Sequence, residues 1–414
     1  MIFKNIYSRL LVTVMALTLI VSCTSTKKDN TNVENARIKA LIVNGQMNNS
    51  HENKAMSEAL ETMLEITGEF NVEFATSPKK GKDMSTFKPN FKDYDVVILD
   101  YDGDEWPEET KNNFVEYVKT GGGVVVVHSA NNAFPDWKEY NEIIGLGGWG
   151  NRNEKHGPYV YWENGEIVRI DTAGVGGSHG DRVPVLVETR NAEHPIMKGL
   201  PPSWLHNRDE LYGNLRGPGK NIDFLATAYS DSKTGGTGKH EPVLFTIKYG
   251  EGRVFHTVLG HVSGRGPQPA IQCAGFIVTL QRGAEWAATG EVLQDVPVEF
   301  PNYASFLLWE DYRPPTLDET FEEIIDYEIG DSKRPFSTLS AHIRNSDQKS
   351  KTLRMYESKM IEILESNAKA DAKNEICRIL SIWGSKKSVS TLEKLKSDNK
   401  CAEMAKYALA RIQG

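Results

Sequence analysis

The sequence predicts an α/β protein with a doubly wound, mostly parallel sheet, followed by a small all-α domain. Strand-like apolar runs alternate with amphipathic helical stretches between residues 36 and about 130. The run at residues 124–127 is apolar at every position, as expected for a strand that helices cover on both faces. Beyond residue 317 the alternation ends, and short amphipathic helices follow one another without strands between them.

The individual elements follow from apolar spacing and from Gly and Pro at their ends. Apolar residues recur at helical spacing from Met56 to Leu64, and Gly68 ends this helix. Pro107 stands in the first turn of the next helix, which ends before Gly121. The predicted strands are residues 38–43, 70–74, 96–99, 124–127, 183–187, 242–247 and 253–259, and the predicted helices of the α/β domain are residues 56–64, 107–118 and 271–286.

Changes in composition set the expected domain boundaries. The α/β domain covers residues 36–295, and residues 296–316, with four prolines, form an extended linker. The helical residues 317–414 resemble a HEAT-type repeat module, in which helices stack in pairs and offer a surface to a protein partner. The alternative for this region is a plain helical cap.

The N-terminus has the features of an export signal. Lys4 and Arg9 precede an apolar stretch at residues 10–21, which is too short to cross a bilayer core of about 30 Å. The following Cys23 completes a resemblance to a bacterial lipobox, which implies a signal peptide at residues 1–22 and a polar tether at residues 23–35. We therefore expect an exported, membrane-anchored lipoprotein at the periplasmic or outer-membrane face, attached to the lipid bilayer through lipidated Cys23. Ordinary secretion, with Cys23 incidental, is the alternative.

Charge and glycine patterns exclude two classes of partner. The chain has 48 Lys plus Arg and 56 Asp plus Glu, so its net charge is 48 − 56 = −8, and no long basic block is present. This balance gives no electrostatic basis for nucleic-acid binding. The glycine-rich stretch at residues 235–240 lacks the first glycine of a phosphate loop, because Lys233 occupies that position, so no nucleotide is expected.

Polar residues at the carboxyl ends of the predicted strands mark a candidate site. In an open parallel sheet these ends meet along one edge, where ligands bind. His51, His128 and His261 each lie at or shortly after such an end, and nine of the ten histidines lie between His51 and His261. Neutral imidazoles are common ligands of zinc and similar divalent ions, so these three histidines are candidate ligands for zinc or manganese. The alternative is that they are hydrogen-bonded core histidines.

A series of blocks between residues 121 and 261 has a recognisable order. The blocks are GGGVVVVHSA at 121–130, FPDWKEY at 134–140, HPI with GLP at 194–201, RDELY at 208–212 and YGEGRVFHTVLGH at 249–261. In these blocks the chain resembles the ThuA-like (trehalose utilisation) family over roughly residues 36–290. The resemblance implies a class I glutamine-amidotransferase-like fold and an association with sugar catabolism, notably with 3-keto-glycosides made by partner oxidoreductases.

Glutamine hydrolysis itself is not expected from this sequence. That reaction needs an activated thiolate on a tight strand-to-helix turn. Here the matching strand runs into His128 and Ser129 with no cysteine, and Ser129 lacks the Gly-x-Ser-x-Gly context of a serine nucleophile.

The expected function is that of an exported sugar-processing enzyme acting on a glycoside or 3-keto-glycoside by elimination, isomerisation or hydrolysis. A ketone at C3 acidifies the neighbouring C2–H, so Asp209 or Glu210 would act as general base. His128 and His261 would polarise the carbonyl oxygen, with or without a metal ion. The expected substrate contacts are Asn48, His51, Trp137 and Tyr212. The alternative is a non-catalytic carbohydrate-binding or scaffold lipoprotein.

Overall fold

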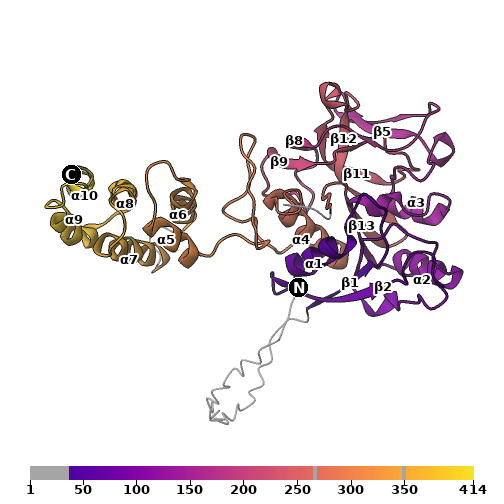
Figure 1. Ribbon diagram of the computed structural model, residues 1–414, viewed down its shortest axis with the longest axis horizontal. Helices are drawn as coiled ribbons and strands as arrows, with labels where there is room; N and C mark the ends of the chain where they lie inside the picture. The colour runs from indigo at the N-terminus through magenta and orange to yellow at the C-terminus, as the bar shows by residue number, and fades with distance from the viewer. Residues whose placement is uncertain (1–36, 264–267, 347–350) are drawn as a thin grey trace, which may run out of the picture. The chain divides into compact units, whose positions relative to one another are not determined.

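The computed structural model describes residues 37–263, 268–346 and 351–414 (Figure 1). The predicted signal peptide at residues 1–22 and the tether with Cys23 lie outside the described residues. None of the helices in the described part of the chain has both the length and the apolar character needed to cross a bilayer.

Eleven strands of the described residues form one mixed sheet, in the order β2–β1–β3–β4–β13–β12–β11–β8–β9, with β5 and β6 joined to it through β12. The parallel half consists of β2 (Phe70–Thr76), β1 (Ile38–Asn44), β3 (Val96–Leu99), β4 (Gly123–Val127) and β13 (Gly252–Thr257). The antiparallel half consists of β12 (His240–Tyr249), β11 (Ile222–Tyr229), β8 (Val183–Thr189), β9 (Ser203–Asp209), β5 (Tyr159–Glu163) and β6 (Glu166–Ile170).

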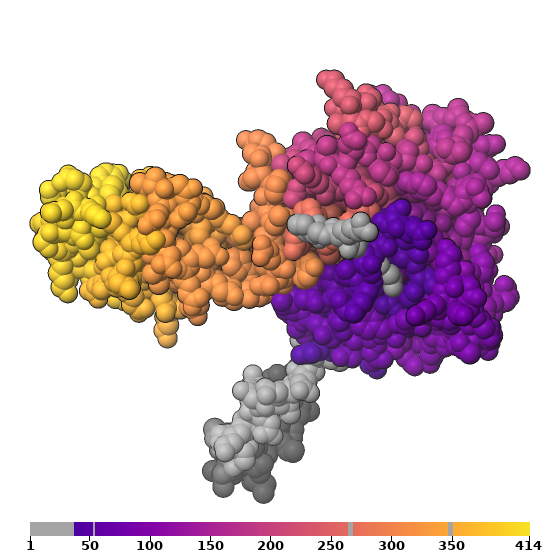
Figure 2. Space-filling view, viewed as in Figure 1, coloured from indigo at the N-terminus to yellow at the C-terminus, as the bar shows by residue number. Residues whose placement is uncertain are grey.

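Helices cover both faces of the parallel half. The helices are α1 (Asn53–Glu65), α2 (Glu108–Lys119), α3 (Lys138–Ile144) and α4 (Ala274–Thr289). Strand order reverses between β1 and β3, so right-handed crossovers place α1 and α2 on opposite faces. α1 packs against α4, and α2 packs against α3. This confirms the predicted doubly wound α/β class, and in Figure 2 the indigo and magenta parts of this domain form one packed body.

The sheet is less parallel than the sequence pattern indicates. Between α3 and β13 no crossover helix of the α/β type is described, and the strands there turn back on their neighbours. Antiparallel strands need only short connections, which suits the loop-rich composition of this region. A separate two-stranded ribbon, β7 (Ser178–His179) with β10 (Tyr212–Gly213), lies in the same region.

Part of the predicted linker packs on the α/β domain. The backbone N–H of Ala274 donates to the carbonyl of Leu307 at 2.8 Å, and the N–H of Trp309 donates to the carbonyl of Gln272 at 2.8 Å. Trp309 is 2% exposed and belongs to the same apolar core as the sheet. The middle of residues 296–316 is therefore a covering segment of this domain.

The C-terminal region is all helical, as predicted. Its helices are α5 (Leu317–Ile325), α6 (Arg334–Asn345), α7 (Lys351–Glu365), α8 (Ala370–Trp383), α9 (Val389–Leu395) and α10 (Ala402–Gln413). They enclose a core of their own that includes Leu339 and Ile376. Cys377 and Cys401 are buried in this core as free thiols. The resemblance to HEAT-type repeats stays a prediction.

Candidate metal centre

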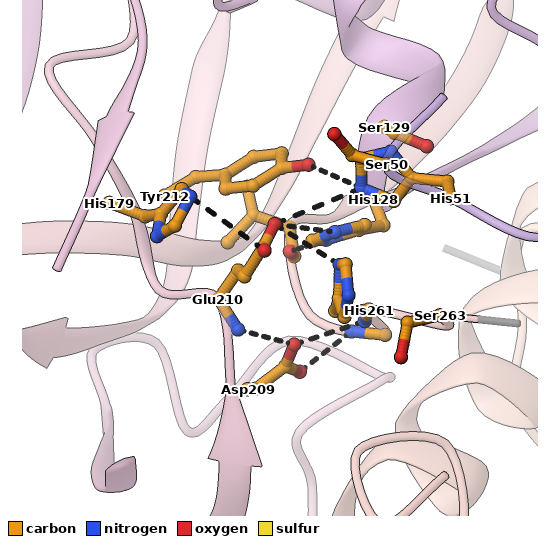
Figure 3. Close-up of polar contacts among 12 residues, drawn as sticks. Ser50, His51, His128, Ser129, His179, Asp209, Glu210, Tyr212, His261 and Ser263 are labelled. Carbon is orange, nitrogen blue, oxygen red and sulfur yellow. Dashed lines mark hydrogen bonds and ion pairs between the residues drawn. The ribbon is translucent and has the colours of Figure 1, made fainter. Parts of the chain in front are cut away.

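Four side chains from distant parts of the sequence point toward one another at the edge of the sheet (Figure 3). His51 lies in the loop between β1 and α1, His128 directly follows β4, Glu210 directly follows β9, and His261 lies in the loop after β13. Each offers one ligand atom, and these atoms all lie within 4.8 Å of one another. The carboxyl ends of three parallel strands thus supply the histidines, and the last antiparallel strand supplies the carboxylate.

Hydrogen bonds fix the ring of His51. Its Nδ1 lies 2.7 Å from Oδ1 of Asn48, and Nδ2 of Asn48 donates to Oδ2 of Asp102 at 2.7 Å. Because Oδ1 of Asn48 can only accept, Nδ1 of His51 carries the proton. Its Nε2 is therefore the nitrogen with a lone pair, and it faces Oε2 of Glu210 at 3.8 Å and the hydroxyl of Tyr212 at 3.2 Å.

His128 is held in the same tautomer and in a strained backbone conformation. Its Nδ1 donates to the carbonyl of Val258 at 2.6 Å, so Nε2 keeps its lone pair. Its φ is 45°, which is uncommon for a residue other than glycine. The strained residue lies where β4 is followed by a 3₁₀ helix, His128–Asn132. This turn directs the ring toward Glu210, whose Oε2 lies 3.8 Å from Nε2 of His128.

Glu210 is oriented by Arg182. Nε and Nη2 of Arg182 donate to Oε1 at 3.0 and 2.5 Å, which leaves Oε2 facing the three histidines. Oε2 lies 3.1 Å from Nδ1 of His261. Burial alone would raise the pKa of Glu210, but its interactions with His128 and His261 outweigh burial and hold that pKa well below its usual range. Glu210 is therefore an ionised carboxylate.

Asp209 holds the backbone of the site rather than facing it. It is 1% exposed, and its Oδ1 accepts the N–H groups of Glu210 at 2.7 Å and His261 at 3.0 Å. Its Oδ2 accepts Nε2 of His206 at 2.8 Å and the N–H of Gly260 at 2.8 Å. With both oxygens engaged twice and no access to a substrate, Asp209 is a positioning residue, and the role of general base predicted for it does not fit.

The residues present fit a divalent ion. Nε2 of His128 and Nε2 of His261 are buried without a hydrogen-bond partner among the described residues, although buried polar atoms normally have one. Nδ1 of His261 faces Oε2 of Glu210 at 3.1 Å but lacks the geometry of a hydrogen bond. Burial and the neighbouring His128 and His261 rings lower the pKa of His51 to about 3, so His51 is neutral at physiological pH. Three imidazoles and one carboxylate are a ligand set for zinc or manganese.

A cavity of about 490 Å³ opens in front of these ligands. Its lining includes His51, Glu210, Asn48 and Tyr212, so two of the predicted substrate contacts lie beside the candidate ligands. The Tyr212 ring stacks on His128 at 4.3 Å between centroids, and its hydroxyl lies 3.2 Å from Nε2 of His51. The cavity is of a size that suits a small polar ligand such as a sugar.

The predicted substrate contact Trp137 does not line this cavity, and neither does Ser129, which its sequence context already argued against as a nucleophile. Trp137 is 8% exposed and packs in an aromatic cluster with Trp106 and Phe134 at centroid distances of 5.9 and 5.4 Å. The expectation that Trp137 contacts a sugar is therefore withdrawn, since its ring faces the core. Ser129 is 3% exposed and donates to Sδ of Met47 at 3.2 Å, which removes it as a nucleophile.

Sequence reasoning assigned no site role to several residues that line the cavity: Asp102, Asn132, Trp149, His179 and Arg182. They come from loops and short strands, where no periodicity shows which side chains face inward. The one available signal for Trp149 was its place directly after the Gly147-Gly148 pair, since small residues often allow a close backbone approach. The ring of Trp149 lies 4.5 Å from that of Tyr212 between centroids, inclined at 60°, and gives this cavity the aromatic lining that was expected from Trp137.

Comparison with known proteins agrees with this fold. The sequence model of the ThuA family, described as trehalose utilisation, matches residues 39–287, and the chain belongs to this family. A ThuA-like protein of Parabacteroides merdae is 50% identical, with a TM-score of 0.65 over 67% of this chain and 100% of that one. A ThuA-like protein of Bacteroides uniformis is 19% identical, with a TM-score of 0.41 over 64% of this chain and 98% of that one. A search of curated proteins finds no match.

Proposed function

We propose that this protein is a metal-dependent enzyme that acts on 3-keto-glycosides. The observation that carries the proposal is the convergence of His51, His128, His261 and Glu210, whose ligand atoms lie within 4.8 Å of one another, beside a cavity that His51 and Glu210 help to line. Membership of the trehalose utilisation family supports a sugar as the substrate.

The chemistry follows from the acidity of a carbon next to a ketone. A divalent ion, when bound, supplies a Lewis acid for the C3 carbonyl oxygen. The chain contributes the three imidazoles, the ionised Glu210 and a cavity lined in part by Trp149, whose aromatic ring suits the C–H surface of a sugar. Loss of the C2 proton then leads to elimination of the C1 substituent, to isomerisation, or to hydrolysis after water adds.

Metal content and turnover test this proposal together. Protein purified without chelator should hold about one zinc or manganese ion per chain by elemental analysis. A panel of 3-keto-glucosides should be consumed by this form and left unchanged after dialysis against a chelator, and activity should return with the ion. His128→Ala and His261→Ala should each lose the ion. A chain that binds sugar with the same affinity in these variants and turns over none of the panel would be a carbohydrate-binding protein instead.

We also propose that the enzyme is exported and anchored through a lipid on Cys23, with the helical residues 317–414 free to dock a protein partner. The lipobox resemblance at residues 20–23 supports the anchor. Membrane fractions of cells that express the full chain should contain the protein, whereas Cys23→Ala should move it to the soluble fraction.

A further inference from the structure

The metal centre leaves the reaction without an obvious proton acceptor. Glu210 has one oxygen bound by Arg182 and the other turned to the three histidines, so it acts as a ligand. Asp209 is buried with both oxygens occupied. A general base must have a free lone pair within reach of the substrate. It must therefore be sought among the other side chains that line the cavity.

Most of these side chains cannot accept a proton. Asn48 and Asn132 are neutral amides, and Arg182 offers only donors and pairs with Glu210. The hydroxyl of Tyr212 is directed at Nε2 of His51 at 3.2 Å and the side chain is 1% exposed, so Tyr212 is not free to take a proton from a substrate. Two candidates remain among the residues that line the cavity, His179 and Asp102.

His179 is the weaker of the two. Its side chain is 37% exposed, at the rim, and its Nε2 is turned toward Oε1 of Glu210 at 3.7 Å. Its Nδ1 donates to the carbonyl of Gly180 at 2.7 Å. Nε2, its other ring nitrogen, therefore faces the carboxylate of the ligand set rather than open space.

Asp102 has the features of a base. Its Oδ2 accepts a hydrogen bond from Asn48 at 2.7 Å, while Oδ1 has no hydrogen-bond partner among the described residues. The loop is fixed, because the N–H of Asp102 donates to the carbonyl of Gln46 at 3.1 Å and the N–H of Asp104 donates to Oε1 of Gln46 at 2.8 Å. Burial raises the pKa of the Asp102 carboxyl, although the bond from Asn48 opposes this, so it is a stronger base than an exposed aspartate.

We propose that Asp102 is the general base of the site and that its Oδ1 takes the C2 proton of the 3-keto-glycoside. This assignment rests on the proposed function. The C2–H bond breaks, the proton moves to Oδ1, and the electron pair of that bond enters the C3 carbonyl as an enolate. In an elimination, the enolate then re-forms the ketone with a C1=C2 double bond, and the C1 substituent leaves with its bonding pair and takes a proton.

The test compares three variants of the metal-loaded protein. Asp102→Asn keeps the shape of the side chain and an oxygen that can accept the hydrogen bond from Asn48, but it removes the carboxylate that would act as the base. Asp104→Asn is the matched control, because Asp104 lies two residues away, binds the N–H of Gly81 and does not line the cavity. His179→Gln tests the competing assignment. The measurements are metal content, kcat and KM on a 3-keto-glucoside, and deuterium incorporation at C2 in heavy water.

The expected result is that Asp102→Asn retains the ion, loses C2 exchange and lowers kcat by about 10²–10⁴-fold with little change in KM. Asp104→Asn should match the wild type. Three outcomes would overturn the assignment while the proposed function survives. Asp102→Asn could lose the ion, which would make Asp102 a positioning residue for His51 through Asn48. Asp102→Asn could change KM alone, or His179→Gln could be the one variant that loses C2 exchange. A wild-type protein without turnover or exchange on the whole panel would overturn both proposals.

Discussion

Each residue of the metal centre is oriented by a group that the fold places behind it. The carbonyl of Val258 sets the tautomer of His128, and Asn48 sets that of His51. Arg182 turns Glu210, and Asp209 holds the backbone of Glu210 and His261. Such outer groups determine how well ligands are aligned, and their loss weakens metal binding as well as folding.

Asp209→Ala should lower the free energy of unfolding by about 3–5 kcal/mol, because it leaves His206 and three backbone N–H groups buried without an acceptor. It should also weaken metal binding by about 10–100-fold. Urea unfolding and metal titration measure the two effects. Asp136→Ala is the control, because the Asp136 side chain is 96% exposed, and its unfolding midpoint should stay at the wild-type value. A variant as stable as the control would show that Asp209 does not support the site.

The sequence allows part of this site to be predicted and hides the rest for physical reasons. His51, His128 and His261 could be found because the carboxyl ends of parallel strands must meet at one edge. Glu210 was noticed through its motif, but its role as a ligand depends on Arg182, which lies 28 residues away in the sequence. Asp102 follows the predicted strand at residues 96–99, but nothing in the sequence separates it from Asp100, which is buried and accepts a hydrogen bond from Ser57.

At the scale of elements, buried histidines join strands to the segments beside them. His256 on β13 is 0% exposed. Its Nδ1 donates to the carbonyl of Ile144, the last residue of α3, at 2.8 Å, and its Nε2 lies 3.2 Å from Nδ2 of Asn131. Since Asn131 donates there, the neutral ring satisfies both contacts. A second proton on Nε2 would face the amide N–H of Asn131.

This arrangement makes the junction of β13 and α3 sensitive to acid. Burial lowers the pKa of His256 to about 3, while the backbone contact with Ile144 opposes the shift; in the unfolded chain the pKa is about 6.5. The folded pKa is the lower one, so the stabilisation is complete above pH 6.5. Below pH 6.5, His256 is protonated in the unfolded state but not in the folded state. The free energy of unfolding therefore falls by about 1.4 kcal/mol for each pH unit down to about pH 3.

His256→Phe removes this titrating group. Between pH 6.5 and 4, the slope of the unfolding free energy against pH should therefore be smaller in the variant by the equivalent of about one proton. The variant should be less stable than the wild type at pH 7.5, since Ile144 and Asn131 lose a partner. Urea midpoints at pH 7.5, 6.0, 5.0 and 4.5 measure both slopes. If the urea midpoints of the two proteins fell in parallel as the pH is lowered, His256 would be taking up its proton in the folded state as readily as in the unfolded state.

The elements themselves were predictable to different degrees. The parallel strands β1, β3 and β4 are continuous apolar runs, and helices on both faces require that pattern. The antiparallel half was only partly visible, because β9 carries polar residues such as His206 and Asp209 that are buried by pairing with one another. A pattern of apolar residues cannot reveal a strand whose core contacts are hydrogen bonds.

At the scale of the whole molecule, the described residues contain two separate apolar cores. One includes the sheet, α1–α4 and Trp309, and the other includes Leu339, Ile376 and the remaining C-terminal helices; they share no buried residue. A domain with its own core can fold by itself. The Parabacteroides merdae protein supports this for the α/β part, because its whole length aligns with 67% of this chain.

Residues 37–315 should therefore fold without the C-terminal helices and bind the same number of metal ions per chain as the full protein. The truncation ends after Trp309, so the covering segment stays attached through Leu307 and Gln272. Calorimetry should show a transition at the temperature of the α/β unfolding in the full chain, and elemental analysis should show an unchanged metal content. The matched control ends at residue 300 and removes Trp309 from the core, so its midpoint should fall, as expected when a buried tryptophan is lost. If residues 37–315 aggregate or lose the ion while the full chain does not, the α/β domain depends on the helices and the two cores form one cooperative unit.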